Sequence, residues 1–263
     1  MKITSVKNMY FSPTGGTKKV TTILSHYFSL PTEEIDFSLP SFLENNAPSL
    51  TFSPETLCII GVPSFGGRVP AIALKNLSTL QGNHAPTILV TSYGNRDFED
   101  TLLELKDALQ SQGFSCIAAI SAVTEHSIMH QFGTGRPDAN DEQQLRSFMA
   151  QIKEKLKNIT CPQDLSPVIV PGNHPYRPYG TVPIYPQISS ICEGCGLCAK
   201  KCPVNAIPKE TPNKTDESLC ISCMRCISVC PKKARQCNQD ILMGLIQKLK
   251  DACSSKKENA LFL

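Results

Sequence analysis

The most constraining feature of this sequence is a cysteine spacing that occurs twice near its C-terminal end. The two copies read Cys192-x-x-Cys195-x-x-Cys198-x-x-x-Cys202-Pro203 and Cys220-x-x-Cys223-x-x-Cys226-x-x-x-Cys230-Pro231. The 263-residue chain has 13 cysteines but no apolar segment typical of a signal peptide or a membrane span. We therefore expect a cytoplasmic protein, in which thiols stay reduced and clustered cysteines bind metal rather than form disulfides.

Both copies resemble the cysteine run of bacterial ferredoxins that bind two 4Fe-4S clusters. Two-residue gaps let three thiolates of one copy reach one cluster, and the fourth cysteine reaches the other cluster. The resemblance implies a first cluster on Cys192, Cys195, Cys198 and Cys230, and a second on Cys220, Cys223, Cys226 and Cys202. The alternative is a pair of zinc sites, but these use paired cysteines rather than triplets followed by Cys-Pro.

Basic and acidic residues are almost balanced over the whole chain, but their distribution along it is uneven. With 26 basic and 23 acidic residues, the formal net charge is +3, which gives no support for a nucleic-acid partner. Residues 188–235 contain 8 basic and 4 acidic residues, a net charge of +4. We expect this segment to attract acidic redox proteins of the ferredoxin or flavodoxin type, as donor or acceptor. The oligomeric state stays open.

Residues 1–157 alternate between apolar runs and amphipathic segments. Strands are expected at 3–11, 33–37, 57–62, 87–93 and 114–123, with helices between them and a last helix at 138–157. This alternation predicts the α/β class, with a doubly wound five-stranded parallel sheet covered by helices on both faces. Ligands of such sheets bind beyond the carboxyl ends of the strands.

The loop between the first strand and the first helix has the composition of a phosphate site. It reads Ser12-Pro13-Thr14-Gly15-Gly16-Thr17 and resembles the phosphate loop of flavodoxins. The backbone amides at a helix start attract a phosphate, and hydroxyl groups complete its shell. Neither a Walker loop nor a G-x-G-x-x-G fingerprint is present in this loop. The resemblance implies that Ser12, Thr14, Gly15, Gly16 and Thr17 bind the phosphate of flavin mononucleotide (FMN).

Two further loops follow the third and fourth expected strands and resemble those that enclose the flavin ring in flavodoxins. They contain Ser64, Phe65, Gly66, Gly67 and Arg68, and Tyr93, Gly94, Asn95 and Arg96. Phe65 and Tyr93 are expected beside the ring, and the chain has no Trp that could stack on it. For Arg68 and Arg96 a solvated role and flavin contact both stay open. His126 and His130 lie near the same edge.

The rest of the chain divides into a linker, the cysteine module and a tail. We expect a Pro-rich extended linker at 158–187, a small α+β ferredoxin-like domain at 188–235, and an amphipathic helix with a tail at 236–263. The helix, at 239–252, should pack against one of the domains, whereas residues 254–263 have no assignment. Cys58 and Cys116 are expected as buried thiols, and Cys161, Cys237 and Cys253 have no assigned role.

Together the two modules resemble flavodoxin–ferredoxin fusion proteins of anaerobes. Clusters carry single electrons and flavins accept one or two, so the resemblance implies electron transfer between a low-potential donor, two 4Fe-4S clusters, FMN and an acceptor protein. A flavin-dependent reductase of a quinone, a nitro compound or oxygen and a cluster-based redox sensor are the alternatives. The three loops contain no cysteine or paired carboxylate, so catalytic residues are not identified and enzymatic activity stays open.

Overall fold

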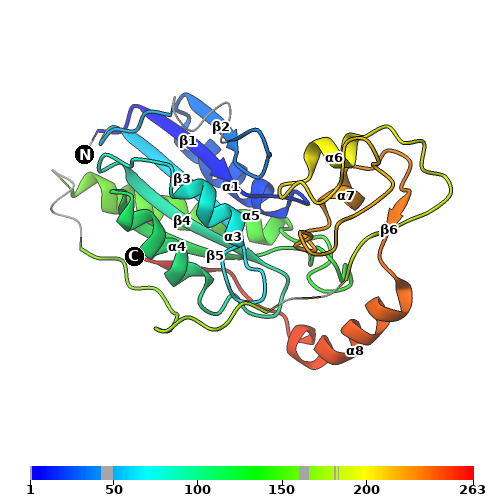
Figure 1. Cartoon of the computed structure of the whole chain (residues 1–263). Coiled ribbons are helices and arrows are strands. Elements are labelled where there is room, and N and C mark those ends of the chain that lie inside the picture. The colour runs from blue at the N-terminus through cyan, green and yellow to red at the C-terminus, as the bar shows by residue number, and fades with distance from the viewer. Residues whose placement is uncertain (1, 43–49, 160–165, 181, 183) are drawn as a thin grey trace.

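The computed structural model describes residues 2–42, 50–159, 166–180, 182 and 184–263. At its centre is a six-stranded sheet in the order β2-β1-β3-β4-β5-β8 (Figure 1). Its strands are β1 (Ser5–Tyr10), β2 (Thr32–Asp36), β3 (Thr56–Pro63), β4 (Pro86–Tyr93), β5 (Ser115–Val123) and β8 (Ala260–Phe262). The first five strands pair in parallel, as predicted.

The strand order β2-β1-β3-β4-β5 is that of the flavodoxin-like doubly wound sheet. β3 and β4 lie at the centre and are buried on both faces, which explains their continuous apolar runs. β8 was not predicted; it comes from the tail that had no assignment, and it pairs antiparallel to β5. The sixth strand therefore adds to the predicted fold without changing its class.

Helices cover both faces of the sheet and create two hydrophobic cores. α1 (Gly16–Ser25) and α5 (Ala139–Lys157) pack on one face, and α3 (Ala71–Leu77) and α4 (Thr101–Ser111) pack on the other. A short 3-10 helix, η1 (His26–Phe28), follows α1. α5 begins with a capping box between Asp138 and Asp141, which satisfies the free amides at its first turn.

The linker lies along the α4 side of the first domain. Val168 and Val170 are buried in the core on that face. The Asp100 carboxylate accepts hydrogen bonds from the backbone amides of Asn173 and Arg177, at 2.9 and 2.6 Å. Apart from residues 160–165, 181 and 183, which include Cys161 and lie outside the described residues, the linker is thus extended and anchored on the surface.

The cysteine module contains two short helices and a two-stranded antiparallel sheet. These are α6 (Leu197–Lys201), α7 (Arg225–Ser228), β6 (Gln187–Ile188) and β7 (Arg235–Gln236). The module lies beside the end of the large sheet, and α8 (Gln239–Ser254) leads from it back to β8 (Figure 1). The chain therefore enters the module from the first domain and returns to that domain.

α8 packs through its apolar side, as the sequence predicted. Leu242, Leu245, Ile246 and Leu249 pack against the buried Met129 and Phe132 of the loop that follows β5, together with Cys253. No helix in the described part of the chain is both long and apolar enough to cross a membrane.

Candidate cofactor sites

The loop between β1 and α1 has a backbone that requires glycine and side chains that fix its shape. Gly15 caps α1 with φ +94°, a left-handed conformation that is unfavourable for residues with a Cβ. The Ser12 hydroxyl accepts a hydrogen bond from the Lys18 amide at 2.9 Å, and the Thr17 hydroxyl lies 2.8 Å from that of Ser92. The loop therefore presents a helix start and hydroxyl groups at the carboxyl end of β1.

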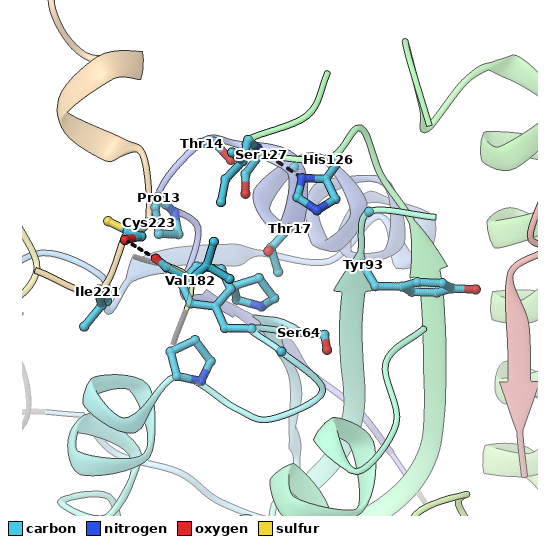
Figure 2. Close-up of a pocket in the computed structure, with 18 of the residues that line it drawn as sticks. Pro13, Thr14, Thr17, Ser64, Tyr93, His126, Ser127, Val182, Ile221 and Cys223 are labelled. Atoms are coloured by element: carbon cyan, nitrogen blue, oxygen red, sulfur yellow. Dashed lines mark hydrogen bonds between the residues drawn. The ribbon is translucent and has the colours of Figure 1, made fainter. Parts of the chain in front are cut away.

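This loop borders a cavity of about 380 Å³ at the carboxyl edge of the sheet (Figure 2). The volume lies within the range of about 300 to 1,000 Å³ that is typical of small-molecule sites. Among the described residues that line it, none is Lys or Arg, but several carry a hydroxyl group: Ser12, Thr14, Thr17, Ser64, Ser92, Thr124 and Ser127. This donor set fits a phosphate held by hydroxyls and amides rather than by a cation.

The structure brings nine of the fourteen predicted flavin residues to this cavity. They are Ser12, Thr14, Gly16, Thr17, Ser64, Phe65, Gly66, Tyr93 and Gly94. Phe65 and Arg68 close a tight turn by exchanging backbone hydrogen bonds around Gly66 and Gly67, whose φ angles are +61° and +84°. The turn positions backbone groups of Phe65 and Gly66 at the cavity.

The other five predicted residues do not line this cavity. Gly15 shapes the phosphate loop, and a Cβ on Gly67 would clash with a Glu99 carboxylate oxygen. Arg68 forms a buried ion pair with Glu104 and stacks on the ring of Tyr179 at 4.2 Å. Its role is to anchor the linker.

Asn95 and Arg96 also have partners outside the flavin cavity. The Asn95 amide donates to the backbone oxygens of Cys253 and Ser255 at 2.6 and 3.0 Å, and so binds the end of α8. Arg96 forms a two-pronged ion pair with Glu99 at 2.9 Å.

Tyr93 contributes to the cavity without directing its ring into it. The side chain points away from the other labelled residues in Figure 2, and its hydroxyl donates to the Glu258 oxygen at 3.2 Å. The ring packs against Phe98 with centroids 5.3 Å apart. Burial raises the pKa of the Tyr93 hydroxyl to about 12, so this group stays protonated.

Three segments line the cavity that the sequence analysis did not identify as flavin contacts. The loop after β5 contributes residues 124–128, the linker contributes Tyr179, Gly180, Val182 and Tyr185, and the cysteine module contributes residues 218–223. Only the position of His126 near the ligand edge was noted from sequence. The contact with the module depends on how the two domains pack, which no local pattern encodes.

His126 is held in one protonation state. Burial, with smaller contributions from the charges of His130 and Arg96, lowers its pKa to about 4, so the ring is neutral at pH 7. Its Nδ1 atom accepts hydrogen bonds from the backbone amides of Ile128 and Met129, at 3.1 and 3.2 Å. The proton must therefore be on Nε2. Gly94 allows this packing, because a Cβ there would lie 2.5 Å from the ring.

The eight cysteines surround two smaller cavities in the crossed arrangement that the ferredoxin resemblance implies. One cavity is lined by Cys192, Cys195, Cys198 and Cys230, and the other by Cys202, Cys220, Cys223 and Cys226. Among the described residues, no three His, Cys, Asp or Glu side chains gather as ligands of one metal ion. Thiolates of a cubane bind different iron atoms and surround a space, so this donor set fits two 4Fe-4S clusters.

The duplication extends from the cysteines to the backbone around them. The amides of Ala206 and Ala234 donate to the sulfurs of Cys202 and Cys230, both at 3.3 Å. Matching positions also share positive φ angles: Gly194 with Ser222, Gly196 with Met224, and Asn205 with Lys233. Non-glycine residues rarely adopt this conformation, which indicates a backbone shaped by a common requirement to approach a cluster closely.

The two cysteine sites differ in their exposure. Cys195 of the first site is exposed, whereas Cys202, Cys223 and Cys226 of the second site are buried. Cys220 and Cys223 of the second site also line the large cavity. The second site therefore adjoins the candidate flavin site, and the first site faces the surface of the module.

Arg225 joins the second cysteine site to the first domain. It lies between Cys223 and Cys226, and its guanidinium is buried. One nitrogen bonds the Ser38 hydroxyl, and another forms an ion pair with Asp36 at 3.0 Å. Asp36 is the last residue of β2 and Ser38 follows it, so the segment that carries the second cysteine triplet is fixed on the large sheet.

Two cysteines outside the module have inert surroundings. Cys58 and Cys116 lie in β3 and β5, and burial raises the pKa of each thiol to about 12. Cys253, near the end of α8, is buried with Met129 and Phe132, and the Cys237 sulfur lies 3.5 Å from the Met224 sulfur.

Comparison with known families identifies the module. Residues 191–234 match the family described as 4Fe-4S dicluster domain, and this segment contains all eight cysteines of the two repeated copies. The chain therefore joins a flavodoxin-like α/β domain to a 4Fe-4S domain, as the sequence predicted. None of the curated proteins matches this sequence.

Solved structures similar to this chain include two flavodoxins. An archaeal flavodoxin shares 14% identity with a TM-score of 0.43, over 59% of this chain and 100% of its own. A flavodoxin of Streptococcus pneumoniae TIGR4 shares 18% identity with a TM-score of 0.40, over 57% of this chain and 99% of its own. An NADH:FMN oxidoreductase, EmoB, shares 14% identity with a TM-score of 0.42, over 61% of this chain and 92% of its own. The case for a flavin rests on the cavity itself.

Proposed function

We propose that this protein transfers electrons between a redox partner protein and FMN through two 4Fe-4S clusters. The observation that carries the proposal is the boundary that the second cysteine site and the large cavity share, formed by Cys220, Ile221 and Cys223. Groups bound in these two sites would be neighbours, so electrons could pass between them within one molecule. Clustered reduced thiols fit a cytoplasmic protein.

The phosphate of FMN would lie at Ser12, Thr14, Gly16 and Thr17, and the ring would lie between the loops after β3 and β4. A bound flavin accepts one or two electrons, whereas each cluster moves one electron at a time. Residues of the linker and the module line the cavity, and we expect them to limit the access of a second protein to the ring. A partner protein would therefore exchange electrons at the first cluster, next to the exposed Cys195.

The order of transfer can be tested with variants that remove one cluster each. Cys192→Ala/Cys195→Ala and Cys220→Ala/Cys223→Ala would be prepared anaerobically with iron, sulfide and FMN. Each should lose about half of the roughly eight iron atoms per chain. Flavin reduction by a reduced acidic ferredoxin at low salt should be lost in both variants. The second variant should still accept electrons into its remaining cluster at the unaltered rate.

A matched control is Cys58→Ala/Cys116→Ala, which removes two thiols that line neither cysteine site. Flavin reduction at the unaltered rate in both cluster variants would contradict the proposal. Binding of zinc in place of iron by reconstituted protein, or release of no flavin on heating, would contradict it before kinetics are measured. Raising the salt concentration should slow the reaction, because the module carries a net positive charge.

A further inference from the structure

A second cavity adjoins the candidate flavin cavity on the side of α8. Its volume is about 110 Å³, and it shares six lining residues with the larger cavity: Ser64, Gly66, Gly94, His126, Ile128 and Val182. A cavity of about 150 Å³ can hold one benzene molecule, so a single small ring would fill this side pocket and extend into the larger cavity. The shared residues place it at the edge of the proposed flavin site.

The far wall of the side pocket comes from α8. Leu245 and Leu249 line it together with Met129, and both leucines belong to the apolar side of the helix. They make one wall of the pocket apolar and suited to the face or edge of a ring. The opposite face of α8 is exposed, and Met243 is 67% accessible.

The polar wall of the side pocket contains one cation among the described residues, Arg96, which is already paired. Arg96 pairs with Glu99, and the Asp97 carboxylate accepts the Glu99 amide at 2.9 Å. These contacts leave no uncompensated cation for an anionic ligand, and burial of a charged ligand without a partner is unfavourable. The pocket therefore disfavours an anionic ligand.

His126 supplies a hydrogen-bond donor to the side pocket. Its Nδ1 atom accepts hydrogen bonds from two backbone amides, and its proton is on Nε2. In the part of the chain that the structure describes, no hydrogen bond from Nε2 to another residue is found, and the ring lines both cavities. A ligand with an oxygen at this position would satisfy the N–H group.

We propose that the side pocket binds a small, neutral, single-ring acceptor with an exocyclic oxygen, such as a nitro or carbonyl compound, and that this oxygen accepts a hydrogen bond from His126 Nε2. The proposal rests on FMN binding in the larger cavity. Reduced FMN carries two electrons and two protons. With nitrobenzene, one N–O bond breaks, and the products are nitrosobenzene, water and oxidised FMN.

The experiment uses the full chain with its cofactors, reduced anaerobically and mixed with nitrobenzene, a probe that does not add to thiols. Reoxidation of the flavin is followed by absorbance. In the unaltered protein the rate should saturate with nitrobenzene concentration. Leu249→Trp, which fills the side pocket, should remove saturation and slow the reaction at least tenfold, while FMN content and flavin reduction by the clusters are retained. Met243→Trp, on the exposed face of the same helix, is the control and should behave like the unaltered protein.

Three outcomes would overturn the inference. A rate that rises linearly with nitrobenzene in the unaltered protein would show that no site exists. Saturation in Leu249→Trp equal to that of the unaltered protein would exclude this pocket, and loss of FMN in that variant would show that the pocket belongs to the flavin. Leu245→Phe is a smaller filling variant and should give the same result if the tryptophan prevents folding. An unaltered protein without FMN would instead contradict the proposed function.

Discussion

His126 illustrates how a single residue obtains a defined chemical state from its surroundings. The two backbone amides at Nδ1 fix the tautomer, and the low pKa of about 4 keeps the ring neutral. An unfolded chain leaves the same histidine with its ordinary pKa near 6.5. The unfolded state therefore binds more protons than the folded state between about pH 6.5 and pH 4, so stability must fall as the pH falls through this window.

We expect the unaltered protein without flavin to lose about 2 kcal/mol of unfolding free energy between pH 7.5 and pH 5 because of His126. His126→Gln, which does not titrate, should lose that much less over the same range. Urea unfolding, measured anaerobically at several pH values, checks this. His84→Gln, which replaces a histidine in a turn away from His126, is the control. Parallel pH curves for His126→Gln and the unaltered protein would contradict the assignment.

The sequence predicted well which kinds of residue bind each cofactor, and less well where individual side chains point. The resemblance of the cysteine spacing to that of bacterial ferredoxins predicted which four thiols line each of the two small cavities. Tyr93 was expected beside the flavin ring, but its side chain packs toward the C-terminal tail. That contact joins residues 165 positions apart, and no local pattern in the sequence contains it.

Among the elements, β8 shows how a short segment can complete a sheet. Only three residues long, it is fixed by the buried Asn259 that precedes it. The Asn259 oxygen accepts the Val123 amide at 2.8 Å, and its amide donates to Asp141 and Gln144, both at 2.8 Å. A longer strand such as β3 was predictable from its continuous apolar run, whereas three residues give no periodicity.

Asn259→Ala should lower the free energy of unfolding by about 1 to 3 kcal/mol, because the Val123 amide and the Asp141 carboxylate would each lose a buried partner. Chemical denaturation under anaerobic conditions measures the difference. Asn140→Ala, which removes an exposed amide of α5, is the matched control and should change stability by less than about 0.5 kcal/mol. Equal stability of the two variants would mean that β8 is not held through Asn259.

At the scale of the whole molecule, the position of the module depends on a buried arginine. Arg225 extends from the second cysteine triplet to Asp36 and Ser38, and its Nε atom has no hydrogen-bond partner in the described part of the chain. Such a residue is costly to bury, and the cost is offset only when its partners are in place. Arg225 thus acts as a positioning residue between the proposed second cluster and the end of β2.

Arg225→Gln should decrease the unfolding free energy by about 2 kcal/mol and slow flavin reduction by the clusters, while iron content stays unchanged. Stopped-flow absorbance with dithionite as the reductant separates this internal step from partner binding. Arg146→Gln, which breaks an exposed pair with Glu142, should cost less than about 1 kcal/mol and leave the rate unaltered. An unchanged internal rate in Arg225→Gln would show that docking does not depend on this residue.

Because the chain returns from the cysteine module to form β8, the module is inserted between β5 and β8 of the large sheet and is not a terminal appendage. A fragment that ends at residue 157 would leave the outer side of β5 without a neighbour. An open strand edge of this kind pairs readily with other chains, so the isolated first domain should aggregate even though most of its core is complete.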